Sequence, residues 1–365
     1  MLSPNKYITQ LIILATLVLP TSAEAGLYGF SHTKETAHAE HLDVPPRHIS
    51  NYRREMRNLL IALSRYGKSR NPNFQILAHE GQYLLDKSLW EYHLDSYNQI
   101  RRSPVAVDDV SFLAKETPDS EDEKTKNIFR YTDAVDGIVV NNHYCQNLPL
   151  HNLIKVLQLP VISIEQCEND KSIDNAITQS FSDKYPIYPF IDTEEAFRNI
   201  YHQLIINETA DNIHNISQAR NISFLIEDDL FDSRYQMLQD IRRSNYDIIV
   251  IRPVFHNQKA FTKEEVDAMK FKQNGARRLI LALYNLSELS KDDYLWKKNW
   301  DKNRPNWLTA KSSVNPNAYI TKYWLPEWKK IAAHYFKSIV DTEYDGVFLT
   351  GLENHNYFER NKPLE

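Results

Sequence analysis

Eight short apolar runs, separated by helix-like stretches, dominate the hydrophobic pattern of this chain. The runs are continuously apolar rather than alternating, which is typical of strands buried on both faces of a parallel sheet. They are Phe74–Ala78, Asp136–Val140, Val161–Glu165, Pro186–Phe190, Ile222–Ile226, Asp247–Ile251, Leu279–Tyr284 and Asp345–Leu349. Eight such units can close a (β/α)8 barrel of the TIM type, in which the chemistry lies on the loops after the strands. The residues just past each run are therefore the candidates for function.

Helices with recognisable end signals fill the gaps between these runs. Asn51–Tyr66 carries its apolar residues on one face, and Gly67 can provide a left-handed stop. A second helix begins at Thr262 with Glu265 as its capping-box partner, and Gly275 is expected to close it. This alternation of strand and helix predicts an α/β fold.

Two further segments complete the organisation of the chain. Pro326 is suited to the first turn of another helix, whose apolar side follows from Trp328 onward. The acidic run Glu116–Asn127 lacks periodicity and is interpreted as a surface insertion. The 365 residues otherwise fit one barrel domain, expected over residues 26–365.

The first 25 residues have the pattern of a secretory signal peptide. Lys6 lies in a short polar segment, residues 7–19 are apolar, and Ala23-Glu24-Ala25 is a small-x-small cleavage site. The alternative is an uncleaved membrane anchor, but the apolar stretch is shorter than the roughly 20 residues that a spanning helix needs. We therefore expect a secreted or periplasmic protein without membrane contact after cleavage.

Charge, glycine and cysteine content narrow the function classes. A net charge of −5 does not match the surface of nucleic acid, so no nucleic-acid partner is expected. With eight glycines and no "GxSxG" elbow, neither a dinucleotide fingerprint nor a hydrolase nucleophile is predicted, and no cofactor is expected. Cys145 and Cys167 each follow a predicted strand, which favours a disulfide over a metal site, with two free thiols as the alternative.

The connection from Tyr294 to Trp328 carries five of the six tryptophans. They are Trp296, Trp300, Trp307, Trp324 and Trp328. Aromatic faces stack on sugar rings, so this density can line a carbohydrate cleft. It can equally serve to bury area in packing. Both interpretations stay open at this point.

Several strand ends resemble those of one family of enzymes. The matching stretches are "NPNFQILAHEGQYLL" at Asn71–Leu85, "YDIIVIRP" at Tyr246–Pro253, "LILALYNLSEL" at Leu279–Leu289, "PNWL" at Pro305–Leu308, "YITKYWLPEW" at Tyr319–Trp328 and "YDGVFLTGLENHNYF" at Tyr344–Phe358. They are similar to the glycoside hydrolases related to endo-α-1,4-polygalactosaminidase, glycoside hydrolase family 114. The resemblance covers most of the chain after the leader. It implies a barrel that hydrolyses an amino-sugar polysaccharide.

The order of these stretches differs from that of the family. Family members run from the "YDIIVI"-like strand through the "DGVFL"-like strand to the "NPNFQIL"-like strand, whereas here the last of these comes first. The resemblance therefore implies a circular permutation, with the cut between the fourth and fifth barrel strands, Asp345–Leu349 and Phe74–Ala78. A closed barrel tolerates such a cut because the separated elements stay neighbours.

The family pattern is only partly kept at the strand ends. Thr350 stands where the family has an Asp after the fourth strand, and Asn141 where it has a Glu after the sixth. These are the two carboxylates expected to carry the reaction. Arg252 stands where the family has an Asp after the second strand. The family's "SIGE" stretch appears here as "NLSE", which keeps Glu288, and its "QNG" at the fifth strand becomes His79-Glu80-Gly81.

Glycoside hydrolysis needs a proton donor and a second carboxylate, roles that Thr and Asn cannot fill. The remaining acidic candidates for catalysis are Glu288, Glu165 and Glu80. The candidates for substrate binding are Tyr284, Thr350, Asn141, Asn142, His79, Trp296, Trp324 and Arg252. Asp345 and Asp136 begin strands at the end away from the predicted site, so we expect them to be structural. His-containing pairs lack the short spacing and third ligand of a metal site, so no metal is expected.

Three functions follow from these residues. The first is a secreted hydrolase of an amino-sugar polymer, with Glu288 and Glu165 as acid and base. The second is a pseudoenzyme that binds polysaccharide or oligosaccharide without cleaving it, because the family carboxylate pair is missing. The third is an interaction protein in which the barrel is only a scaffold. Fold alone does not decide among them.

Overall fold

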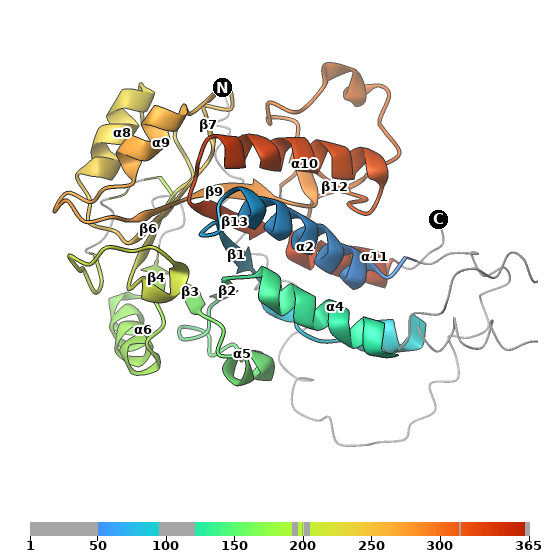
Figure 1. Cartoon of the computed structure of the whole chain (residues 1–365), viewed down its shortest axis with the longest axis horizontal. Coiled ribbons are helices and arrows are strands. Elements are labelled where there is room, and N and C mark those ends of the chain that lie inside the picture. Colours follow the sequence, from blue (N-terminus) through green and yellow to red (C-terminus); the bar gives the residue numbers. More distant parts are fainter. Residues whose placement is uncertain are drawn as a thin grey trace, which may run out of the picture.

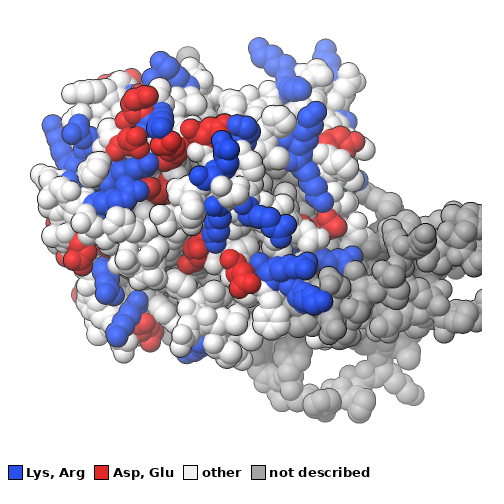
Figure 2. Space-filling model, viewed as in Figure 1, with Lys and Arg blue, Asp and Glu red and all other residues white. Residues whose placement is uncertain are grey.

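The computed structural model describes residues 50–94, 121–191, 196–198, 200, 205–313 and 315–361. The expected signal peptide lies outside the described residues. None of the helices within the described part is both long enough and apolar enough to cross a bilayer. On the face drawn in Figure 2, acidic and basic side chains are interspersed.

Eight parallel strands form one sheet that curves into a nearly closed barrel (Figure 1). They are β1 (Gln75–His79), β2 (Gly137–Asn141), β3 (Val161–Gln166), β4 (Ile187–Phe190), β5 (Ile222–Leu225), β6 (Ile248–Ile251), β9 (Leu279–Asn285) and β13 (Gly346–Thr350). Their order in the sheet is β4-β3-β2-β1-β13-β9-β6-β5. The edge strands β4 and β5 contact each other across the remaining gap. All eight predicted strands, and the α/β barrel architecture, are thereby confirmed.

Helices surround this sheet, and α10, α2 and α4 lie side by side along one part of it (Figure 1). The helices are α2 (Tyr52–Arg70), α4 (Glu121–Ala134), α5 (Asn152–Val156), α6 (Asp170–Asp183), α8 (Arg234–Arg242), α9 (Lys263–Met269), α10 (Pro326–Asp341) and α11 (His355–Arg360), with short 3-10 turns at η2 (Gly81–Leu84), η4 (Ile216–Gln218), η5 (Lys298–Asp301) and η6 (Leu352–Asn354). Small additional strands are β7 (Val254–Phe255), β8 (Lys259–Ala260), β10 (Glu288–Ser290), β11 (Leu308–Lys311) and β12 (Ala318–Thr321). The last three form an antiparallel sheet in the connection between β9 and α10.

The predicted helix starts are confirmed, whereas two predicted stops are wrong. Thr262 caps α9 in a capping box with Glu265, and Pro326 is the first residue of α10. Helix α2 continues through Gly67, where a Cβ atom would lie 2.7 Å from the ring of Phe74. That glycine therefore permits close packing rather than a stop. Helix α9 ends at Met269, before Gly275 at φ 88° in a tight turn.

The acidic segment interpreted as an insertion is partly helical. Helix α4 begins at Glu121, inside that segment, and continues to Ala134. The interpretation of the whole segment as a surface insertion was therefore wrong. Periodicity is hard to see there because charged residues fill the first turns of the helix, and its buried apolar residues, such as Tyr131, come later.

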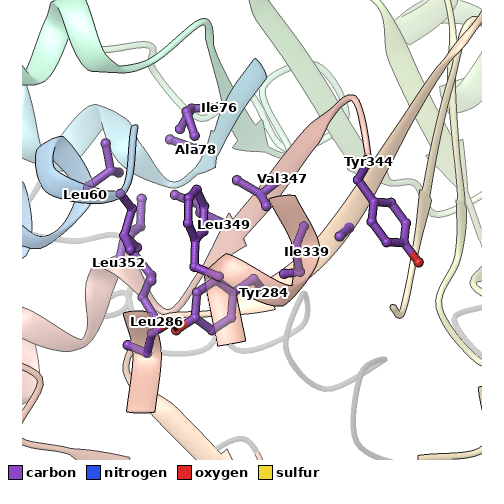
Figure 3. Close-up of a cluster of buried hydrophobic side chains, with 14 of the residues drawn as sticks. Leu60, Ile76, Ala78, Tyr284, Leu286, Ile339, Tyr344, Val347, Leu349 and Leu352 are labelled. Carbon is purple, nitrogen blue, oxygen red and sulfur yellow. Dashed lines mark hydrogen bonds between the residues drawn. The ribbon is translucent and has the colours of Figure 1, made fainter. Parts of the chain in front are cut away.

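Alternation along the strands separates two cores. Side chains such as Leu77, Ile164 and Phe348 fill the barrel interior, whereas Ile76, Val140 and similar neighbours pack outward. Figure 3 shows part of the outer core, where Leu60 of α2 and Ile339 of α10 approach outward-facing residues of β1 and β13. Position along a strand therefore decides which residues can reach the interior of the barrel.

Two aspartates tie the amino-terminal ends of the strands together. Asp136 Oδ2 accepts the backbone N–H of Ile76 at 2.8 Å, and Asp345 Oδ2 accepts that of Ile280 at 2.9 Å. Each therefore joins two neighbouring strands at the end away from the mouth. The expectation that both aspartates are structural is confirmed. This arrangement agrees with a stabilising role for that face of the barrel.

Candidate functional site

A cavity of about 440 Å³ opens at the carboxyl end of the barrel. Its lining comes from the ends of β1, β3, β5, β6, β9 and β13 and from one side of α10. Phe197, Phe224 and Phe348 of the barrel interior form its apolar floor, and Tyr294 and Tyr335 also line it. This is the place where barrels of this kind hold their substrates.

The last inward-facing position of the strands around this mouth carries no carboxylate in the described part of the chain. Because side chains alternate between the two faces of each strand, the residues at these last inward-facing positions are His79, Asn141, Gln166, Phe190, Ile226, Arg252, Asn285 and Thr350. Imidazole, amide, hydroxyl and guanidinium groups can bind a sugar, but they do not form the acid and base pair of a glycosidase. Carboxylates must therefore reach the cavity from the loops beyond the strands.

Five of the candidates from the sequence line the cavity together. They are His79, Arg252, Tyr284, Glu288 and Thr350. Tyr284, however, is one of the residues of β9 whose side chains point away from the barrel interior. Its hydroxyl donates to the backbone oxygen of Ala332 in α10 at 3.1 Å. Figure 3 accordingly shows its side chain among the outer core residues. Its hydroxyl is thus already used in joining β9 to α10.

Glu165 lies outside the cavity lining and holds a loop in place. Its carboxylate accepts the backbone N–H groups of Tyr144 at 3.1 Å and Cys145 at 2.8 Å, and also the hydroxyl of Ser163. It faces outward, like Ser163, because both lie on the side of β3 away from the barrel interior. Burial raises the pKa of Glu165, and these hydrogen bonds oppose the rise. The structure therefore gives this carboxylate a packing role.

The loop that Glu165 holds is also joined by the disulfide between Cys145 and Cys167, whose Cα atoms are 5.3 Å apart. Asn142 belongs to the same loop and has a left-handed φ of 54°. Its side-chain oxygen accepts the backbone N–H of Gln166 at 2.7 Å. Asn142, like Glu165, therefore links the loop after β2 to β3 and is not in the cavity lining.

Glu80 is buried behind the cavity. Its carboxylate accepts hydrogen bonds from the side chain of Gln82 and the backbone of Asn141, while burial and the nearby charge of Glu353 raise its pKa to about 8. Glu353 also has a carboxylate oxygen that no described residue contacts by a hydrogen bond. Glu80 is not among the lining residues, so its carboxylate does not reach the cavity.

Most tryptophans of the aromatic connection pack against other rings. Trp296 stacks on Tyr319 with centroids 5.6 Å apart, and Trp324 contacts Phe358 at 4.6 Å. Neither is in the lining, whereas Trp328 is. Trp328 is nevertheless 2% exposed, and its indole N–H donates to the backbone of Leu286. The packing interpretation therefore describes these rings better than a stacking platform for sugar.

Glu288 is the one sequence candidate for catalysis that lines the cavity. Asn354 Nδ2 donates to its carboxylate at 3.1 Å, and the side chains of Ser312 and Asn285 also hydrogen bond to it. Burial raises the pKa of Glu288, and these donors oppose the rise. Its carboxylate is thus held by uncharged groups toward the β13 side of the cavity.

Five acidic residues that line the cavity did not emerge from the sequence: Glu227, Asp228, Asp229, Asp292 and Asp293. Glu227 follows β5 by two residues and is 6% exposed, and Asp293 lies in the connection after β10. Burial raises the pKa of Glu227 to about 7 and also raises that of Asp293. The positive charge of Arg252 opposes both shifts. Glu227 fits the expectation that functional residues lie just past the ends of the barrel strands.

Arg252 lies at the end of a strand between the strands that lead to Glu227 and Asp293. It follows β6, which lies between β5 and β9 in the sheet, and its Nε donates to the backbone oxygen of Ile226 at 2.8 Å. That bond turns the guanidinium toward the end of β5. A positive charge held here can stabilise a carboxylate or bind an oxygen of a substrate.

Two buried side chains at the ends of β1 and β2, those of His79 and Asn141, have polar atoms without a hydrogen-bond partner among the described residues. His79 lies 3% exposed in the lining, and its Nε2 is 3.0 Å from Asn141 Oδ1. Among the described residues, His79 Nδ1 and Asn141 Nδ2 have no hydrogen-bond partner. Buried polar groups are nearly always paired in native proteins, so these atoms indicate where a polar ligand group or water binds. The described residues contain no cluster of His, Cys, Asp or Glu suited to a metal ion.

Comparison with known proteins relates parts of the chain to proteins of undescribed activity. An uncharacterized protein of Methanocaldococcus jannaschii is 29% identical over 164 residues, which are 43% of this chain and 46% of that protein. An uncharacterized protein of Thermotoga maritima is 30% identical over 78 residues, 21% of this chain and 24% of that protein. The matches thus span less than half the length of these curated relatives. No protein-family model matches the chain.

Proposed function

We propose that this protein is a glycoside hydrolase that cleaves an amino-sugar polysaccharide of the polygalactosaminidase type. The observation that carries the proposal is the cavity at the barrel mouth, where carboxylates from different loops surround an aromatic floor. Acid and base groups facing one concave site are what glycoside hydrolysis requires. The proposed localisation is secreted or periplasmic, in agreement with the disulfide, which persists in an oxidising compartment.

The charge of the cavity supports an amino sugar as the substrate. Six carboxylates line it, from Glu227, Asp228, Asp229, Glu288, Asp292 and Asp293. Arg252 is the single arginine or lysine in the described lining. A polymer that carries free ammonium groups is attracted to such a surface, whereas an acidic polymer is repelled.

A circular permutation is part of this proposal. The hydrogen-bonded sheet opens between β4 and β5, which would be the last and first strands in the family order. Strands β13 and β1, on either side of the proposed cut, pair in parallel. A permuted chain also matches unpermuted relatives only in pieces, because an alignment stops at the cut.

The direct test is the release of reducing ends by the purified protein. We expect release from de-N-acetylated α-1,4-linked galactosamine polymer, with much less from the N-acetylated polymer and none from an uncharged α-1,4-glucan. High salt should weaken binding of the cationic polymer, because it screens the attraction between opposite charges. An absence of new reducing ends from all three polymers would contradict the proposal.

The second candidate function is sugar binding without turnover. It is favoured by the lack of a carboxylate at Thr350 and Asn141, at the ends of β13 and β2, which the resemblance matches to the two family carboxylates. A binding protein would retain the cationic polymer without cleaving it. The double variant Thr350→Asp, Asn141→Glu distinguishes the two functions, because activity that appears only in the variant would identify a degenerate site.

A further inference from the structure

We infer that Glu227 and Asp293 are the catalytic carboxylates of this cavity, with Glu227 as proton donor and Asp293 as base. This inference rests on the proposed function and names a pair that replaces the two lost family positions. Both residues line the cavity and come from loops after neighbouring parts of the sheet, with Arg252 on the strand between. Such a pair puts one carboxylate on each side of a bound sugar.

The other rim carboxylates already have protein partners. Asp228 accepts the backbone N–H of His256 at 2.6 Å, and Asp229 pairs with Arg198 at 2.5 Å. Asp292 accepts a hydrogen bond from Asn317 Nδ2 at 3.1 Å. These contacts hold the rim loops in place, as the backbone N–H of Leu295 also does for Asp293, so hydrogen bonding alone does not select the pair.

Glu288 differs from the proposed pair in its surroundings. Its carboxylate is held by Asn354, Ser312 and Asn285, and it lies close enough to Glu353 to raise the pKa of that group. It therefore belongs to the side of the cavity formed by β13. Glu227 and Asp293 instead share the field of Arg252, which places them around the same part of the cavity.

The environments of Glu227 and Asp293 differ in the charges and hydrogen-bond donors around each carboxyl group. Glu227 is buried and has two further acidic neighbours in Asp228 and Asp229, so its pKa of about 7 keeps a proton available near neutrality. Asp293 starts from a lower ordinary pKa of 3.8 and receives the backbone N–H of Leu295 at 2.8 Å. Burial raises the pKa of both carboxyl groups, so the assignment of donor and base rests on the acidic neighbours of Glu227 and on the N–H donated to Asp293.

An independent feature points to a ligand at the same place. His79 is 3% exposed and lines the floor of the cavity. Its Nδ1 lacks a hydrogen-bond partner among the described residues. A polar group of a ligand bound in the cavity would satisfy this nitrogen. The floor therefore has a polar group prepared for substrate, separate from the acidic residues of the rim.

The proposed step is a single displacement by water. The Asp293 carboxylate takes a proton from water, and the water oxygen forms a bond to the anomeric carbon. The bond from that carbon to the departing oxygen breaks, its electron pair leaves with the oxygen, and Glu227 gives that oxygen its proton. Exchange of protons with solvent then restores both groups. A single displacement of this kind needs the wider carboxylate separation, which leaves room for the water.

The test compares two substrates whose leaving groups differ in how much they need a proton donor. Galactosamine polymer has a poor leaving group, whereas para-nitrophenyl α-galactosaminide has a good one. Glu227→Gln should lower kcat/KM on the polymer by about 10²-fold or more and affect the aryl substrate much less. Asp293→Asn should lower both by a similar factor. Glu168→Gln and Asp174→Asn, both exposed and outside the lining, are the matched controls and should leave both rates unchanged.

A measurement on the unmodified protein accompanies the variants in case they fold poorly. Its rate on the polymer should fall above about pH 7 because Glu227 loses its proton, while the rate on the aryl substrate should not. Retention of activity by Asp293→Asn, or loss of aryl-glycoside cleavage in Glu288→Gln alone, would overturn the inference and leave the proposed function intact. A protein that cleaves neither substrate would overturn both.

Discussion

His79 Nε2 lies 3.0 Å from Asn141 Oδ1, at the carboxyl ends of the adjacent strands β1 and β2. An amide oxygen can only accept, so the hydrogen of the ring resides on Nε2 and the unpartnered Nδ1 is an acceptor. Burial lowers the pKa of His79 to about 4, and the bond to Asn141 opposes this only in part. The floor of the cavity therefore presents a neutral imidazole to a substrate donor.

Asn141→Asp should reverse this state of His79. A carboxylate beside the ring favours the imidazolium, so the pKa of His79 should rise by roughly 1–3 pH units. NMR titration of the histidine ring signals measures this shift, with the exposed His214 as an internal reference. A His79 pKa that stays near 4 in the variant would show that the two side chains do not interact as described.

Lys272 should be among the most sensitive positions for stability. Its Nζ lies 2.5 Å from Asp247 Oδ1 at the amino-terminal end of β6, and both side chains are fully buried. Lys272→Met leaves the aspartate charge without its partner and should lower the free energy of unfolding by about 3–5 kcal/mol. Chemical denaturation measures the loss. Lys329→Met, which breaks the half-exposed pair with Glu55, should cost at most about 1 kcal/mol. Equal losses in the two variants would contradict this account.

Glu80 should make stability depend on pH. Its pKa rises from 4.5 in the unfolded chain to about 8 in the folded protein, chiefly because it is buried. Its contribution is thus fully present below pH 4.5 and is lost as pH rises toward 8, by up to about 1.4 kcal/mol per pH unit. Glu80→Gln cannot titrate, so its stability relative to the natural protein should increase from pH 5 to pH 8. Parallel stability curves for the two proteins would rule out this role.

The disulfide should stabilise the loop after β2. Cys145 and Cys167 are 22 residues apart, so the link restricts the unfolded chain. The double variant Cys145→Ser, Cys167→Ser should lower the free energy of unfolding by about 3 kcal/mol. Thermal unfolding with and without reductant provides the measurement. If reductant shifts the transition of the double variant as much as that of the natural protein, the effect does not come from this bond.

The strands were predictable because their signal is local. Each apolar run is long enough to identify a buried strand, and eight runs with intervening helices leave few alternatives to a barrel. The capping box at Thr262 and the first-turn Pro326 are likewise local signals, and both helix starts were found. Gly67 shows the limit of predicting from local signals. Its role depends on a contact with the ring of Phe74, and the local sequence pattern does not reveal that contact.

The site was less predictable because it depends on the direction of each side chain. Glu165 and Tyr284 end predicted strands, yet both face the outer layer, and applying the alternation of each strand would have shown this. Glu227 was within reach of the strand-end rule but stood beside two other acidic residues that resemble a solvated turn. Asp293 lies in the connection after β10, and its place near Arg252 depends on how that connection folds onto the barrel.

The most direct test of the central claim is a crystal structure of the protein soaked with a short galactosamine oligosaccharide. We expect a sugar in the cavity at the barrel mouth, with its glycosidic oxygen near Glu227, its anomeric carbon facing Asp293 and a polar group near the His79 ring. A sugar bound elsewhere on the molecule, or a cavity that stays free of sugar at saturating concentration, would contradict it.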